Sequence, residues 1–141
     1  MILKVLPSTL SGDNVWAPPS KSIMQRALAL ATFAEGTTML RRPSESDDCT
    51  QAMMMSAQLG ADIELGDDAV AIHGHFPLAP RDTTLTPGES GLGLRMFGIL
   101  AALHPDPLVM ERSGSLLTRD VSGLPEAPDA FGVKVENTAP P

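Results

Sequence analysis

The chain has a lysine and an arginine at a point where a helix is expected to begin. Pro18 and Pro19 prevent a helix before Ser20, and Arg26 follows Ser22 by one turn. A cation in the first helical turn opposes the dipole by about 0.3–1 kcal/mol, unless an anion binds the free N–H groups there. The segment therefore predicts that Lys21, Ser22 and Arg26 bind a phosphate or carboxylate. The alternative is a solvated Lys21 beside a simple N-cap.

A second candidate is the run Gly88-Glu89-Ser90-Gly91-Leu92-Gly93-Leu94-Arg95. It is not a dinucleotide-binding motif, because Met96 stands where the third glycine is required. Its glycines still let a ligand approach the backbone ahead of a helix, which predicts binding roles for Gly91 and Arg95. A plain turn before a helix is the alternative. Arg119 is a third candidate, and the case for its binding a ligand depends on the other two sites.

The elements expected to position these residues follow the order helix, strand, helix, hairpin. Apolar residues at three- and four-residue spacing predict a helix over 20–33, and a β-branched stretch predicts a strand over 37–40. Ser46 as N-cap and Gly60 as C-cap bound a second helix. Alternation around a glycine-containing turn predicts a hairpin formed by 61–65 and 69–73.

The same order recurs about seventy residues later, which indicates an internal repeat. A helix is predicted over 90–103, a strand over 108–110 and a strand over 133–135, whereas prolines interrupt the helix expected between 118 and 130. We expect one partial α/β domain over 1–141, with one unit at about 17–76 and an incomplete one at about 82–141. The unpaired last strand would leave an open edge, which predicts possible self-association.

Composition limits the function classes. The 141 residues carry 10 Lys and Arg against 17 Asp and Glu, a net charge of −7, which argues against a nucleic-acid-binding surface. No apolar run approaches a membrane span and no export signal is evident, so we expect a cytoplasmic protein with no membrane partner. Cys49 has no second cysteine to pair with, and His73-Gly74-His75 lacks a third metal ligand in sequence.

Taken together, the motifs resemble those of the enolpyruvyl transferases, and within them the EPSP synthase family, over about residues 18–135. The segments that carry the resemblance are Ser20-Lys21-Ser22 with Arg26, Glu35-Gly36-Thr37-Thr38, Ser46-Asp47-Asp48, Gly88-Glu89-Ser90-Gly91 with Arg95, and Thr118-Arg119.

The resemblance implies a fold of two lobes, each built of three βαβαββ units, of which this chain would form about two units of one lobe. It also implies transfer of the enolpyruvyl group from phosphoenolpyruvate to shikimate 3-phosphate, with release of phosphate and without metal or organic cofactor. Glyphosate would be a possible inhibitor.

By the same resemblance, Lys21, Ser22 and Arg26 match positions that bind shikimate 3-phosphate, and Lys21, Gly91 and Arg119 match positions that bind phosphoenolpyruvate. The family's proton-transfer carboxylates have no counterpart in this chain. Its catalytic residues are therefore unknown, and we expect the chain alone to be inactive.

Two alternatives stay open. The first is a relative of UDP-N-acetylglucosamine enolpyruvyl transferase, although Ser22 argues against it because that enzyme typically has Asn there. The second is a non-catalytic, self-associating α/β module. Two departures from the family pattern bear on the site: Glu89 stands where many members have Asn, and Leu92 where many have Thr.

Overall fold

The computed structural model describes residues 2–9, 11–12, 14–120 and 132–136. This part of the chain is a mixed α/β structure, as the sequence predicts. In chain order its elements are α1 (Lys21–Thr32), β1 (Gly36–Arg41), α2 (Asp47–Gln58), β2 (Asp62–Leu65), β3 (Ala69–Gly74), β4 (Thr84–Leu85), α3 (Gly91–Ala101), β5 (Val109–Met110) and the 3₁₀ helix η1 (Gly114–Leu117).

Serine side chains begin two of the three α-helices. The Ser20 hydroxyl accepts a hydrogen bond from the Ile23 N–H at 3.4 Å, and the Ser90 hydroxyl accepts one from the Gly93 N–H at 3.0 Å. Each satisfies one of the N–H groups that a first turn leaves unpaired. At α2, Ser46 takes the extended N-cap conformation without a side-chain capping hydrogen bond, and Asp47 and Asp48 complement the dipole.

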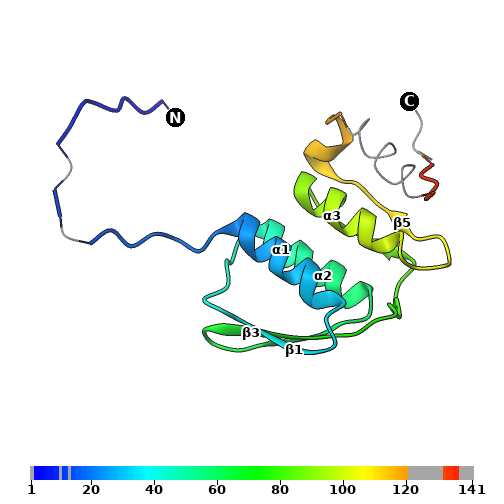
Figure 1. Cartoon of the computed structure of the whole chain (residues 1–141). Helices are drawn as coiled ribbons and strands as arrows, with labels where there is room; N and C mark the ends of the chain where they lie inside the picture. The colour runs from blue at the N-terminus through cyan, green and yellow to red at the C-terminus, as the bar shows by residue number, and fades with distance from the viewer. Residues whose placement is uncertain (1, 10, 13, 121–131, 137–141) are drawn as a thin grey trace.

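The larger sheet has three antiparallel strands in the order β1-β3-β2. Ile72 of the central strand pairs with Thr38 on one side and Ile63 on the other. In Figure 1, α1 and α2 lie side by side above this sheet, and α3 lies next to them on the side away from it. Beyond α3, β4 and β5 form a short parallel pair.

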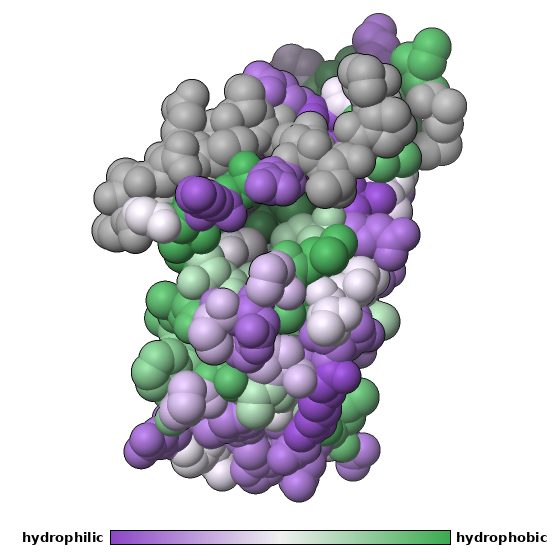
Figure 2. All heavy atoms as spheres, turned by 90° about the vertical axis from the view of Figure 1, so that its right-hand side faces the viewer, coloured by the Kyte–Doolittle hydropathy of each residue, from purple (hydrophilic) through white to green (hydrophobic). Residues whose placement is uncertain are grey.

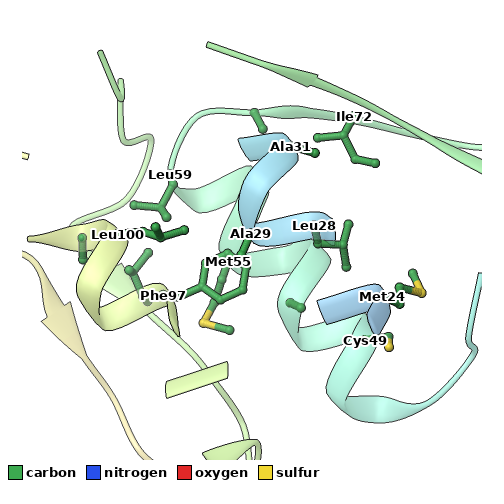
Figure 3. Packing of buried hydrophobic residues seen from close by; sticks show 14 of the residues in the cluster. Met24, Leu28, Ala29, Ala31, Cys49, Met55, Leu59, Ile72, Phe97 and Leu100 are labelled. Carbon is green, nitrogen blue, oxygen red and sulfur yellow. The ribbon is translucent and has the colours of Figure 1, made fainter. Parts of the chain in front are cut away.

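The three helices and β3 share one hydrophobic core, shown in Figure 3. Fully buried side chains come from every one of these elements: Leu28 from α1, Met55 from α2, Ile72 from β3 and Phe97 from α3. Cys49 belongs to this core as well. The shared core fixes how the N-terminal ends of the helices are placed relative to one another.

One expectation about the second unit needs correction. Residues 133–135 form no strand, because a strand needs a hydrogen-bonded partner and the described segments offer none beside them. Conversely, β4 was not expected, since its two residues stand among turn-forming residues. The helix expected between 118 and 130 lies almost wholly outside the described residues. The unit boundaries and the self-association stay predictions.

Within the described residues, no helix is both long and apolar enough to span a bilayer. Figure 2, viewed from the right-hand side of Figure 1, shows hydrophobic and hydrophilic residues interspersed over that face. Several large apolar side chains outside the core are indeed exposed, among them Leu65, Phe76 and Ile99. Such scattered exposure is normal for a small domain.

Candidate functional site

The N-terminal ends of α1, α2 and α3 meet at one place. The ammonium nitrogen of Lys21, the first residue of α1, lies 2.8 Å from Oδ2 of Asp48 in the first turn of α2. The Cys49 thiol donates to the Lys21 carbonyl at 3.5 Å. Gln25 of α1 reaches the N-cap of α3, where its Nε2 lies 2.7 Å from the Ser90 hydroxyl. Three sets of first-turn N–H groups therefore lie near each other, an arrangement that favours an anion.

Lys21 is a cation at this meeting point. The hydrogen bond and the charge of Asp48 raise its pKa above the ordinary value of 10.5, while the positive charge of Arg119 acts in the opposite direction. Its side chain is 51% exposed, so a solute can reach it. Lys21 is thus charged at neutral pH and electrostatically coupled to a second cation that is distant in sequence.

Gly91, Arg95 and Arg119 meet at the first turn of α3. A Cβ atom placed on Gly91 would lie 3.3 Å from Nη1 of Arg95 and 3.5 Å from Nη1 of Arg119. Arg95 also donates to the Gly91 carbonyl at 3.1 Å. The missing side chain of Gly91 leaves room beside two guanidinium groups, which suit the recognition of phosphate or carboxylate oxygens.

Ser22 and Arg26 lie on an exposed part of α1. Nη1 of Arg26 donates to the Ser22 carbonyl at 2.9 Å, so this side chain folds back along its own helix. Among the described residues, the hydrogen bond of the Arg26 side chain goes to the Ser22 carbonyl and not to the other site residues. The structure therefore brings together Gly91, Arg95 and Arg119 and places Lys21 where it feels the charge of Arg119. Ser22 and Arg26 lie beside Lys21 along α1.

Sequence reasoning missed the residues that hold the cations in place. Asp48 was named only as part of a family segment, yet its carboxylate pairs with Lys21. Gln25 was not singled out, although it is a fully buried amide on a mainly apolar face of α1, which also buries Thr32. That buried polar position was the available signal.

Glu89, the unusual residue of the glycine-rich run, supports the turn that precedes Arg119. Its Oε2 accepts a hydrogen bond from the Ser115 N–H at 3.1 Å. The Ser115 hydroxyl, its backbone N–H and the charge of Arg119 together lower the pKa of Glu89 below its ordinary value of 4.5. Of the two Ser115 groups, the N–H has hydrogen-bond geometry and the hydroxyl does not. The Glu89 carboxylate thus makes a structural hydrogen bond and is not an unpaired charge.

The pH dependence of unfolding should reveal this contact. Because the folded-state pKa of Glu89 is depressed, its stabilisation is present above the ordinary value of 4.5 and is lost as the pH falls through the folded-state pKa. We expect the thermal midpoint of Glu89→Gln to fall less on acidification over that window than that of the parent chain. Melting curves at a series of pH values check this, with Glu45→Gln, an exposed glutamate of a different loop, as control. Parallel curves for Glu89→Gln and the parent would contradict it.

An open groove lies beside the N-terminal part of α1 and the end of β1, and the N-cap residues Ser20 and Ser46 are part of its lining. It is lined in part by Trp16, Ile23, Met39 and Arg42, and the Arg42 guanidinium lies 5.7 Å from the centroid of the Trp16 ring. The groove includes none of Lys21, Gly91, Arg95 and Arg119. We therefore assign the candidate site to the meeting helix ends rather than to this hollow.

Comparison with known proteins shows the family of the chain. The family described as EPSP synthase (3-phosphoshikimate 1-carboxyvinyltransferase) matches residues 6–139. The chain belongs to the EPSP synthase family. The 3-phosphoshikimate 1-carboxyvinyltransferase of Chlamydia caviae is 35% identical over 131 residues, which cover 92% of this chain and 29% of that enzyme. The Acetivibrio thermocellus enzyme is 43% identical over 108 residues, 75% of this chain and 25% of its own.

The fold is similar too. EPSP synthase from Acinetobacter baumannii superposes with a TM-score of 0.78 at 26% identity, covering 86% of this chain and 28% of that one. The chain thus spans less than a third of the length of the relatives and solved structures it matches.

Proposed function

We propose that this chain provides part of the substrate site of a 3-phosphoshikimate 1-carboxyvinyltransferase. The reaction transfers the enolpyruvyl group of phosphoenolpyruvate to a hydroxyl of shikimate 3-phosphate and releases phosphate. The observation that carries the proposal is that the Arg95 and Arg119 guanidinium groups lie against Gly91 in the first turn of α3, with the Lys21 ammonium group close enough to feel the charge of Arg119. Both substrates are anions, so several cations in one place are what their binding requires.

Phosphoenolpyruvate is the substrate that this convergence fits. A phosphate beside Gly91 would meet the Arg119 guanidinium and the first-turn N–H groups of α3, with Lys21 near by. The Asp48 carboxylate already holds the Lys21 ammonium group at this end of α1. Fixing a cation before the ligand arrives reduces the entropy lost on binding.

Shikimate 3-phosphate is proposed to bind along α1, at Ser22 and Arg26 with Lys21. The Arg26 side chain is exposed and bonds to the Ser22 carbonyl, so its guanidinium retains N–H groups for a phosphate. Lys21 would then lie between the two anionic substrates. Binding both substrates at once holds the reacting groups near each other, and this proximity lowers the barrier of a bimolecular transfer.

Titration calorimetry tests the proposal. We expect the chain to bind shikimate 3-phosphate weakly, and Lys21→Ala and Arg26→Ala to lose at least about tenfold in affinity, since a hydrogen bond to a charged group contributes roughly 1.5–3 kcal/mol. Lys4→Ala and Arg41→Ala remove exposed cations outside the site and serve as matched controls. No binding by the parent chain, or equal losses in the controls, would contradict the proposal.

Binding rather than complete catalysis is proposed for this chain taken by itself. It spans about 29% of the first curated relatives, and the family groups expected to transfer protons have no counterpart in it. An assay with both substrates should therefore show no turnover, and robust turnover would overturn this part of the proposal. Glyphosate should displace phosphoenolpyruvate if it shares the Gly91 site.

A further inference from the structure

Gln25 connects the N-terminal ends of all three helices through one buried side chain. It lies in the second turn of α1 and is completely buried. Its Nε2 donates to the Ser90 hydroxyl at 2.7 Å and to the Asp48 carbonyl at 3.2 Å. One amide group therefore contacts the N-cap of α3 and the first turn of α2 from within α1.

Both partners of Gln25 are next to groups that face the proposed ligand. Asp48 holds the Lys21 ammonium group with its side chain while its carbonyl accepts from Gln25. Ser90 directly precedes Gly91, against which the Arg95 and Arg119 guanidinium groups lie. The Gln25 amide thus bonds directly to the residue that pairs with Lys21 and to the residue that precedes Gly91. Its hydrogen bonds go to Ser90 and Asp48 and not to either arginine.

The Gln25–Ser90 bond is also the one side-chain hydrogen bond between α1 and α3 in the part of the chain that the structure describes. Apolar packing holds these helices together but tolerates small shifts along their axes. A short hydrogen bond of fixed direction restricts such shifts. Without it, the distance between Lys21 on α1 and Gly91 on α3 would be less well defined.

Placing the Gln25 amide at this buried position lowers the stability of the fold. Its Oε1 is buried without a hydrogen-bond partner. An unpaired buried acceptor destabilises a fold, whereas Met would fill a similar volume without that cost. The amide nitrogen of Gln25 is hydrogen-bonded and its oxygen is not. Such a residue is more readily explained by a role in arranging the site than by a role in stability.

We propose that Gln25 is a positioning residue for the anion site, which aligns the starts of α1 and α3 so that Lys21 and the Gly91 turn contact the same phosphate. This inference rests on the proposed function, because the ligand it invokes is phosphoenolpyruvate. Gln25 itself does not touch the ligand. It acts through Ser90 on one side and Asp48 on the other.

A matched pair of variants tests the inference. Gln25→Met keeps the volume and removes the amide. Thr32→Val removes another buried α1–α2 contact, the 2.9 Å bond between the Thr32 and Ser56 hydroxyls, nearly two turns further from the site. We expect Gln25→Met to weaken phosphoenolpyruvate binding about tenfold, a loss of about 1.4 kcal/mol, and Thr32→Val to change it less than about twofold. Calorimetric titration of each variant measures this.

Ser90→Ala, combined with Gln25→Met, distinguishes a positioning role from a general loss of stability. If Gln25 acts through Ser90, the affinity losses of Gln25→Met and Ser90→Ala are not additive in the double variant, whereas independent losses would add. Should Gln25→Met fail to fold, Gln25→Asn takes its place, because the shorter side chain retracts the amide from Ser90 and should lower the affinity as well.

The outcomes separate the inference from the proposed function. If the parent chain binds phosphoenolpyruvate and Gln25→Met binds it equally tightly, the inference is wrong and the proposed function stands. Equal weakening by Thr32→Val, or additive losses with Ser90→Ala, would likewise reduce Gln25 to a stabilising residue. If the parent chain binds no phosphoenolpyruvate, the inference and the proposed function are both wrong.

Discussion

Gly91→Ala is expected to weaken phosphoenolpyruvate binding by at least about tenfold without lowering the thermal midpoint. The new methyl group would lie 3.3 Å from Nη1 of Arg95 and 3.5 Å from Nη1 of Arg119, in the space proposed for the phosphate. Crowding a fixed site costs about 1–3 kcal/mol. Gly91 begins α3 without a positive φ angle, so alanine fits the backbone there and is the better helix former.

Titration and a melting curve on the same sample check both halves of this prediction. Gly66→Ala is a suitable control, because its methyl group would make only an ordinary 3.4 Å contact with the Ala69 carbonyl, in a turn of the sheet. Unchanged affinity of Gly91→Ala would show that the phosphate does not approach the first turn of α3. A lowered midpoint would instead indicate that the two arginines cannot move aside.

Much of the first unit could be predicted from the sequence because its signals are local. The apolar spacing and the two prolines before Ser20 predict α1 closely, and the glycine-containing turn predicts the hairpin of β2 and β3. The strand expected over 133–135 was wrong for the opposite reason. Its β-branched residues give a strand propensity, but a strand forms only when a partner is present, and a partner is not a local property.

The candidate site was predictable to the extent that its residues belong to motifs. Lys21, Gly91, Arg95 and Arg119 were found from their positions at helix starts and from the family resemblance. Their supports were not found, because the contacts join residues far apart in the chain: Gln25 with Ser90 and Glu89 with Ser115. Such pairs depend on how the helices pack, which the spacing of residues along one helix does not determine.

Gly74→Ala is expected to cost more stability than any change at the site, at least about 3 kcal/mol, and to lower the thermal midpoint by roughly 10 °C or more. At the end of β3, a methyl group would lie much too close to the Ala31 carbonyl oxygen and 2.7 Å from that of Ala34, both of which are backbone atoms. A flexible side chain could turn away, but here the end of α1 itself would have to lift from the sheet.

That displacement would also reach the site. Leu28 of α1 and Ile72 of β3 belong to the core that fixes the helices in place, so lifting the end of α1 disturbs the contacts that hold Lys21 and Gln25. Chemical denaturation of Gly74→Ala against Gly66→Ala measures the difference, with the second variant expected to lie within about 1 kcal/mol of the parent. Equal stability of the two variants would mean that α1 and β3 are not packed as closely as the structure shows.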